Sequence, residues 1–185
     1  MTAGEPSSGA RQPVEVARTF LNLVTARRWD DAVCLIDRET KERFRAWALL
    51  GLAEPQPPQP LVTDTYFLSV EAILGVRDLA EAESLTADEL LVRHAAARSR
   101  QMERFIPYDL AAAPPEFVHL RTRRAGDAAY CEFRRTGTEA TPRHFDPTQR
   151  VHLIRRANDW FVRDADLLGY GDGRILPPDH ERWSA

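Results

Sequence analysis

The sequence predicts an α+β protein, in which N-terminal helices pack on a curved antiparallel sheet and a helical insert separates the two. Apolar residues recur every three or four positions through residues 13–50 and again through 66–106, as on the buried face of a helix. After Pro114-Pro115 the period changes to two, as in strands with one buried face. Short polar turns separate the alternating segments, which is typical of antiparallel hairpins.

The length and composition fit one domain with a sizeable core. The chain has 185 residues, of which 43% are hydrophobic, and this length is ordinary for a single domain. Residues 1–12 are rich in Ser, Gly, Ala and Thr and are expected to form a disordered tail. Residues 13–168 are expected to form the domain, with its insert at about 52–113, and residues 169–185 a C-terminal loop and tail.

The first helix is expected to begin at Pro13, because proline at the first helical position loses no hydrogen bond. Arg27 and Arg28 suit the negative end of the helix dipole, so the helix is expected to end there. Between these limits, apolar residues spaced three and four apart mark one buried face: Val14, Ala17, Phe20, Leu21 and Val24.

Two more helices are expected before the insert. A short one is predicted at about Asp30–Ile36, with Trp29 packing at its start, and a longer one from about Thr40 to Leu50. Gly51 follows the second of these and is a plausible stop, since glycine commonly ends helices.

The insert begins with proline and continues with helices. Four prolines lie between Pro55 and Pro60, so this segment is expected to be extended and free of helix. It could serve as a polyproline ligand for a partner domain or as a stiff connector, and we favour the connector. Further on, Thr86 and Glu89 have the spacing of a capping box, which predicts a helix start there.

A first β-hairpin is expected from Phe117–Arg123 and Ala128–Thr136. The Gly-Asp pair between them is a favoured two-residue hairpin turn. Such a turn fixes which residues face each other across the strands. The expected pairs are Arg121 with Glu132, Leu120 with Phe133, and Thr122 with Cys131.

A second hairpin is expected from Arg150–Arg156 and Trp160–Leu168, joined by the three residues Ala157-Asn-Asp159. The sheet should then have four to six strands. A three-residue connection predicts these pairs across the second hairpin: Ile154 with Val162, Leu153 with Arg163, and His152 with Asp164.

Several kinds of chemistry are excluded by missing motifs. The chain has no Walker-type phosphate loop, no His-Glu-x-x-His, no Cys-x-x-Cys and no Gly-x-Ser-x-Gly. His144 and Asp146 could supply two metal ligands, but a plain surface loop explains two such residues better. No metal and no cofactor is therefore expected.

Acid–base chemistry remains, and His152 with Asp164 is the best candidate pair. A carboxylate beside an imidazole raises the imidazole pKa and fixes its tautomer, which suits a general acid or base. The alternative is an exposed cross-strand ion pair of little energetic value. The face of this pair is expected to carry Ile154, Trp160 and Val162 as apolar walls.

The charge distribution disfavours nucleic acid as a partner. The net charge is −3, whereas domains that bind nucleic acids are usually basic. Residues 117–163 do hold ten arginines against five acidic residues. Arginines beside aromatic rings can bind phosphate and bases, but we favour a solvated outer face or a contact with the acidic helices. That face is expected to carry His119, Arg121, Arg123, Tyr130, Glu132 and Arg134.

The remaining signals are those of a cytoplasmic protein without a membrane segment. No apolar stretch approaches the roughly 20 residues of a transmembrane helix, and the N-terminal residues lack the apolar core of a secretory signal. Cys34 and Cys131 are expected to be buried free thiols rather than a disulfide. His94 is expected to be a satisfied histidine of the core or its boundary.

The order of elements resembles the NTF2-like superfamily, also described as SnoaL-like or as the cystatin-type α+β cone. Val14–Val24 together with Trp29-Asp-Asp-Ala32 resemble the opening helix pair of that family. Val151–Asp166, with the pattern V-x-L-I-R-R-x-x-x-W-F-V-x-D, resemble its last two strands. Residues 52–113 depart from the family, because they are longer and more helical than a minimal member needs.

The resemblance implies a small-molecule-binding protein with an apolar pocket between the sheet and the first helix. The ligand would be a small apolar or polyketide-like molecule. One alternative is an isomerase, dehydratase or cyclase that uses His152 and Asp164, and another is a non-enzymatic interaction domain that forms a homodimer through its sheet. The residues expected to line the pocket are Phe20, Val24, Tyr108, Asp109, Ile154, Trp160 and Val162.

Overall fold

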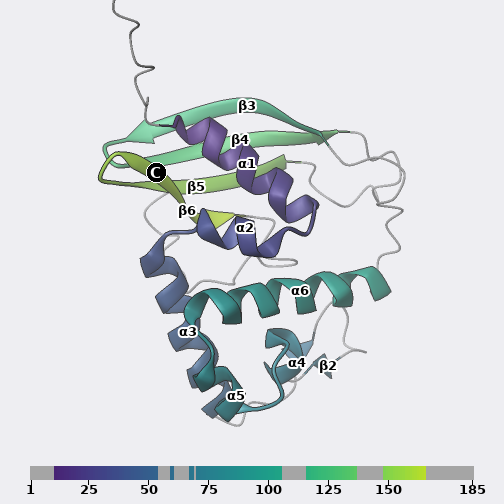
Figure 1. Cartoon of the computed structure of the whole chain (residues 1–185). Coiled ribbons are helices and arrows are strands. Elements are labelled where there is room, and N and C mark those ends of the chain that lie inside the picture. Colours follow the sequence, from purple (N-terminus) through teal and green to yellow (C-terminus); the bar gives the residue numbers. More distant parts are fainter. Residues whose placement is uncertain are drawn as a thin grey trace, which may run out of the picture.

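A computed structural model of the chain describes residues 11–53, 59–60, 67–68, 70–105, 116–136 and 148–165. The predicted α+β class is confirmed, since helices form the N-terminal part and a four-stranded antiparallel sheet follows them. Figure 1 shows α1 lying across one face of this sheet, with α2 beside it and the remaining helices farther away. We call the face under α1 the inner face and the opposite one the outer face.

Helix α1 (Pro13–Thr25) begins at Pro13 as predicted, and its buried residues include Phe20, Leu21 and Val24. It ends in a reversed turn rather than with cations in its last turn. The backbone N–H of Arg28 donates to the carbonyl of Leu23 at 2.9 Å, and Arg27 has a left-handed φ of 59°. This arrangement satisfies carbonyls that the helix end leaves without partners.

Helix α2 (Trp29–Cys34) turns the chain toward the edge of the sheet. The next residues run beside the last strand, where the N–H of Asp37 donates to the carbonyl of Val162 at 2.8 Å and the N–H of Val162 donates to that of Leu35 at 2.8 Å. The Arg156 guanidinium also binds the buried Asp37 carboxylate, with Nε 3.1 Å from Oδ1. These contacts cover the exposed edge of the sheet.

Four helices form a second layer, which we call the helical lobe: α3 (Arg38–Ala53), α4 (Val70–Leu74), α5 (Leu79–Ser84) and α6 (Ala87–Phe105). Helix α3 continues through Gly51, so the predicted stop there is wrong. The predicted capping box of Thr86 and Glu89 is confirmed, because the N–H of each residue donates to the side chain of the other. The described part of the insert is helical apart from two short paired strands, β1 (Gln59–Pro60) and β2 (Phe67–Leu68).

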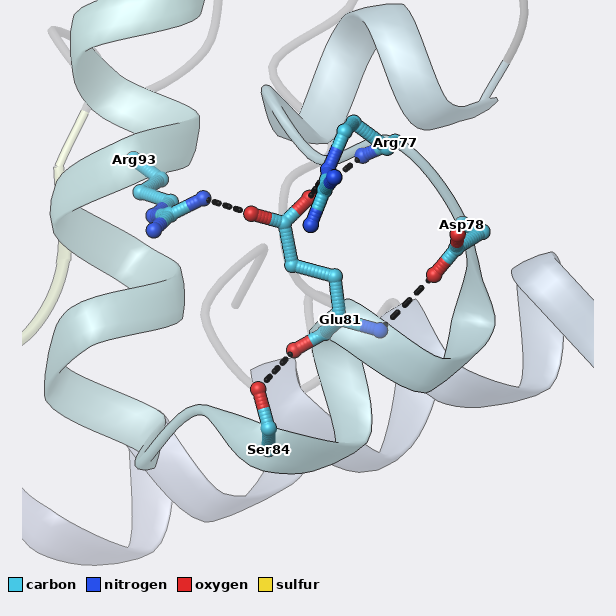
Figure 2. A network of polar contacts seen from close by, with 5 residues as sticks. All are labelled: Arg77, Asp78, Glu81, Ser84 and Arg93. Atoms are coloured by element: carbon cyan, nitrogen blue, oxygen red, sulfur yellow. Dashed lines mark hydrogen bonds and ion pairs between the residues drawn. The ribbon is translucent and has the colours of Figure 1, made fainter.

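A carboxylate in the helical lobe joins α5 to its neighbours. Figure 2 shows Glu81 between Arg77, which precedes α5, and Arg93 on α6. The Glu81 carboxylate accepts from the Arg77 backbone N–H at 2.8 Å and from the Arg93 guanidinium at 2.5 Å. Asp78 caps the helix by accepting from the Glu81 N–H at 2.8 Å. These donors hold the pKa of Glu81 at about 2, because they stabilise the charged carboxylate.

His94 on α6 is buried in the helical lobe with 2% of its surface exposed. Its Nδ1 lies 2.9 Å from the Ile73 carbonyl oxygen, which can only accept, so this nitrogen carries the proton. Nε2 is buried and has no hydrogen-bond partner among the described residues. The prediction of a buried histidine is confirmed, but only one of its two nitrogens is satisfied. Burial lowers the pKa of His94 to about 4.

The main sheet contains β3 (Glu116–Ala125), β4 (Ala128–Thr136), β5 (Thr148–Arg156) and β6 (Asp159–Ala165) in sequential order. Although β3 and β6 are opposite edges, the Arg124 guanidinium on β3 lies 5.9 Å from the centre of the Trp160 ring on β6. Three strand intervals would separate the edges of a flat sheet by about 14 Å. The long side chains of Arg124 and Trp160 therefore reach toward each other over the inner face of the sheet.

The first hairpin has the predicted Gly-Asp turn, with Gly126 at a left-handed φ of 59°. The predicted pairs Arg121–Glu132 and Thr122–Cys131 are confirmed. The pair of Leu120 with Phe133 is wrong, because a bulge at Leu120 makes His119 the partner of Phe133. The extra residue moves His119 to the inner face, away from the arginines it was expected to join.

The second hairpin differs from the prediction at its turn. Asp159 pairs with Arg156, so the connection has two residues instead of three. Val162 therefore pairs with Leu153 instead of Ile154, and a bulge at Arg163 then restores the predicted pair of His152 with Asp164. That pair is confirmed, although the register on either side of the bulge is not the same.

Both cysteines are free thiols, as predicted. Cys131 is buried on the inner face of the sheet, but Cys34 is exposed. The buried face of α2 is formed by Ala32 and Val33, so Cys34 falls on the side of the helix that faces away from the core. The expectation that both thiols are buried is wrong for Cys34.

Candidate functional site

The structure divides the predicted pocket residues between two faces of the sheet. Phe20, Val24, Trp160 and Val162 are buried in the core on the inner side, where α1 packs against β6. Ile154 lies on the outer face, because its strand neighbours Leu153 and Val151 take the inner one. Tyr108 and Asp109 lie outside the described residues.

The bulge at Arg163 explains this division. Val162 and Ala165 are both buried on the inner face although three positions separate them. Simple alternation would put Asp164 on the face of Trp160 and Val162, but the extra residue turns it to the outer face. The expectation that His152 and Asp164 share a face with Trp160 and Val162 is therefore wrong.

On the outer face, one side chain from each strand joins a continuous line across the sheet. Arg123 on β3 pairs with Tyr130 on β4, Tyr130 pairs with His152 on β5, and His152 pairs with Asp164 on β6. Register partners on one face are close enough for their side chains to interact. We call these four residues the polar row.

Two further lines flank the polar row. On the side of the hairpin turns, Ile154 pairs with Ala128 and with Phe161, and Ala128 pairs with Ala125, which gives an apolar row of four residues. On the other side, Glu132 pairs with Arg121 and with Arg150, which gives a charged row. The outer face therefore offers apolar, aromatic and charged groups in three adjacent lines.

The rows are linked by direct contacts. The Tyr130 and His152 rings meet edge to face with centroids 5.0 Å apart at 64°, a favoured geometry for aromatic pairs. The Tyr130 hydroxyl donates to Glu132 Oε2 at 3.4 Å, and the Arg121 guanidinium forms an ion pair with the same carboxylate oxygen. Only 13% of the Glu132 side chain is exposed, so these donors satisfy a largely covered charge.

The electrostatics keep Tyr130 protonated and the arginines charged. Burial, followed by the nearby Glu132 charge, raises the pKa of Tyr130, since both disfavour the phenolate. The hydrogen bond and charge of Glu132 also raise the pKa of Arg121. Tyr130 is therefore a hydrogen-bond donor at neutral pH.

Positive charge predominates on the outer face. Arg121, Arg123, Arg134 and Arg150 lie there with the carboxylates of Glu132 and Asp164. Arg123 and Arg134 make no hydrogen bond or ion pair within the described part of the chain. The guanidinium groups of these two exposed arginines are therefore available to an anion.

The sequence predicted several residues of this site on two separate hairpins, but it did not predict that these residues form one site. Tyr130, Arg123 and Glu132 were expected on one face of the first hairpin, and His152 and Asp164 on a face of the second. The contact of Tyr130 with His152 depends on the pairing of β4 with β5, whose connection of residues 137–147 is too long to fix a register. In a regular strand, residues on one face are two or four positions apart, but Val162 and Ala165 are three apart. This break in the alternation was the sequence signal for the bulge.

Metal binding gains no support from the described residues, which contain no group of three or more His, Cys, Asp or Glu side chains arranged to hold an ion. In the same residues, none of the helices has the length and apolar character needed to cross a membrane. No protein-family model, curated protein or solved structure matches the chain.

Proposed function

We propose that the protein binds a small organic molecule on the outer face of its sheet, with the polar row at the centre of the site. The observation that carries this proposal is the line of Arg123, Tyr130, His152 and Asp164, one from each strand, between an apolar and a charged row. Ligand sites commonly combine apolar and aromatic surface with a few placed polar groups.

This proposal retains the small-molecule function that the resemblance to NTF2-like proteins implies and moves its place. Large side chains already occupy the space between α1 and the sheet, with Phe20, Phe133 and Val162 each 0% exposed. The outer face instead carries partly exposed groups that can donate and accept hydrogen bonds.

A fragment screen followed by amide NMR would test this proposal. Binding should shift the signals of residues around Tyr130 and His152, and Tyr130→Ala and His152→Ala should each weaken binding about ten-fold. Thr148→Ala is the matched control, because Thr148 lies on the same sheet beyond the charged row. Ligands that perturb only α1 and the inner face, with unchanged affinity in both variants, would overturn the proposal.

A second copy of the chain is the competing occupant of this face, as the predicted homodimer requires. Light scattering over a range of protein concentrations distinguishes the two occupants. A stable dimer that loses its association when Tyr130 or His152 is replaced would favour the homodimer and count against a small ligand.

An acid–base enzyme is a second candidate, favoured by the position of His152 between the Tyr130 ring and Asp164. Isomerases, dehydratases and cyclases all benefit from a group that takes a proton and returns it. Exchange of the α-protons of 2-tetralone in D₂O offers a direct assay. His152→Gln should abolish protein-dependent exchange while leaving the melting temperature nearly unchanged, and absence of exchange with the native protein would reject this candidate.

A further inference from the structure

We infer that the ligand of the outer face is an organic anion, with its charged group at Arg123 and its apolar body over Ile154 and Phe161. This inference rests on the proposed binding function and adds the chemical class and the orientation of the ligand. It follows from two observations. Some arginines of the outer face already interact with other groups of the chain, and the two exposed arginines without such interactions in the described residues differ in their neighbours.

The arginines of the charged row are poor partners for a ligand. Arg121 is held by Glu132, and removing it would leave a carboxylate that is only 13% exposed without its main cation. An uncompensated charge in a covered position is costly. Arg150 is the register partner of Glu132 on the other side and is likewise engaged.

Arg123 and Arg134 are the two exposed arginines of this face without such partners in the described residues. Their surroundings differ. Arg123 is the register partner of Tyr130, whose ring continues to that of His152. Arg134 is paired with Val118 and Thr148, with no aromatic ring in its line. A guanidinium beside aromatic surface can bind a planar anion and its ring system together.

The apolar row sets the position of the ligand body. Ile154 and Phe161 are register partners on β5 and β6, one line away from the polar row. Arg123 lies on β3, two strands from Ile154 and three from Phe161, which is about 10–14 Å at ordinary strand spacing. Because the long Arg123 side chain can extend over part of this distance, a compound of two or three fused rings with one carboxylate can span the remainder.

A polyanion such as nucleic acid fits less well than a single small anion. The described outer face has only two arginines without partners, and four positions separate Tyr130, the partner of Arg123, from Arg134 along β4. The chain as a whole has a net charge of −3, which opposes the long basic surface that nucleic acid requires.

The test compares 2-naphthoate with the uncharged 2-naphthamide by NMR titration of the full chain. The native protein should bind 2-naphthoate about ten-fold more tightly, and Arg123→Gln should remove this preference while leaving the 2-naphthamide affinity unchanged. Arg134→Gln is the matched control and should change both affinities less than two-fold. Both substitutions replace exposed side chains, so folding should be preserved.

The outcomes separate this inference from the proposed function. Equal binding of both probes on the outer face, or equal losses in the two arginine variants, would overturn the anion inference and leave the binding function standing. Failure of both probes to shift outer-face signals at millimolar concentration would reject both. Tighter binding of a ten-nucleotide single strand than of 2-naphthoate, with loss in both arginine variants, would overturn the inference in favour of a polyanion.

Discussion

The sheet and the helical lobe accommodate their polar side chains in different ways. In the sheet, Tyr130, His152 and Glu132 stand on the outer face, where cross-strand neighbours and partial exposure satisfy them. In the helical lobe, His94 is buried, and its Nε2 has no partner in the part of the chain that the structure describes. In a sheet with one buried face, the polar residues of a strand can lie on the solvent-exposed face. A helix that is packed on several sides has little exposed surface on which to place them.

The two regions also use left-handed glycines differently. Gly75 after α4 has φ 72°, and a Cβ there would lie 2.9 Å from the Ala97 Cβ on α6. Gly126 in the first hairpin has φ 59°, and no atom of the described residues lies within 4 Å of the same position. The glycine of the lobe permits close helix packing as well as an unusual backbone conformation, and the glycine of the sheet permits only the conformation.

The largest predicted effect concerns the inner face of the sheet. Trp160→Ala should lower the free energy of unfolding by about 3–5 kcal/mol, because it removes a buried aromatic side chain from the core. His152→Ala, on the outer face, should change it by less than about 1 kcal/mol. Urea unfolding of both variants measures the difference. Equal large losses would mean that His152 belongs to the core and that the two faces are not functionally distinct.

Acid should act on the helical lobe through His94. Its pKa in the folded protein is about 4, against an ordinary 6.5. Between these pH values His94 is protonated in the unfolded chain but neutral in the folded one. The free energy of unfolding therefore falls as the pH decreases from about 6.5 to about 4. The full loss is about 3 kcal/mol, at 1.36 kcal/mol per pKa unit.

His94→Phe separates this effect from other acid effects. The new ring can still pack on Phe44, whose centroid lies 5.1 Å from that of His94, but it cannot titrate. The variant should be less stable than the native protein at pH 7.5, because the Ile73 carbonyl loses its donor. Its stability should depend less on pH between 6.5 and 4.5, and an unchanged slope in urea titrations would contradict the assignment.

The two glycines offer a matched pair of substitutions. Gly75→Ala should cost about 2–3 kcal/mol, because backbone strain adds to overlap with Ala97 and the Arg93 carbonyl. Gly126→Ala should cost only about 1 kcal/mol of backbone strain. Thermal melts of the two variants compare them directly. A larger loss at Gly126 would mean that close helix packing does not distinguish the lobe from the sheet.

The smallest predicted effect is a gain of stability at the second hairpin turn. Ala157 has a left-handed φ of 53°, a conformation that glycine adopts without steric cost. Ala157→Gly should therefore raise the free energy of unfolding by up to about 1 kcal/mol. The extra conformational entropy that glycine gives the unfolded chain reduces this gain. A lower melting temperature in this variant would show that the turn is not strained.

The fold class and most elements were predictable because their signals are local. Pro13 at the start of α1, the capping box of Thr86 and Glu89, and the Gly-Asp turn each involve residues within four positions of one another. Within such distances the backbone has few conformations, so the amino-acid types largely decide among them. Each of the two hairpins follows from such local signals, whereas the pairing of β4 with β5 that joins them does not.

The arrangement of the candidate site needed the tertiary structure. The polar row exists because β4 pairs with β5 in a register that no local turn fixes, and because a bulge at Arg163 turns Asp164 to the outer face. The hydrogen bonds of Val162 to Leu35 and Asp37 lie just before that bulge and come from a segment over 120 residues earlier in the chain.

The sequence by itself determined which residues alternate along a strand and which recur along a helix. Only the tertiary structure decided which face of the sheet each alternating set occupies, since one extra residue in a strand reverses every later assignment. It also decided the state of His94, because the burial of one nitrogen without a partner among the described residues depends on how closely α3, α4 and α6 approach one another.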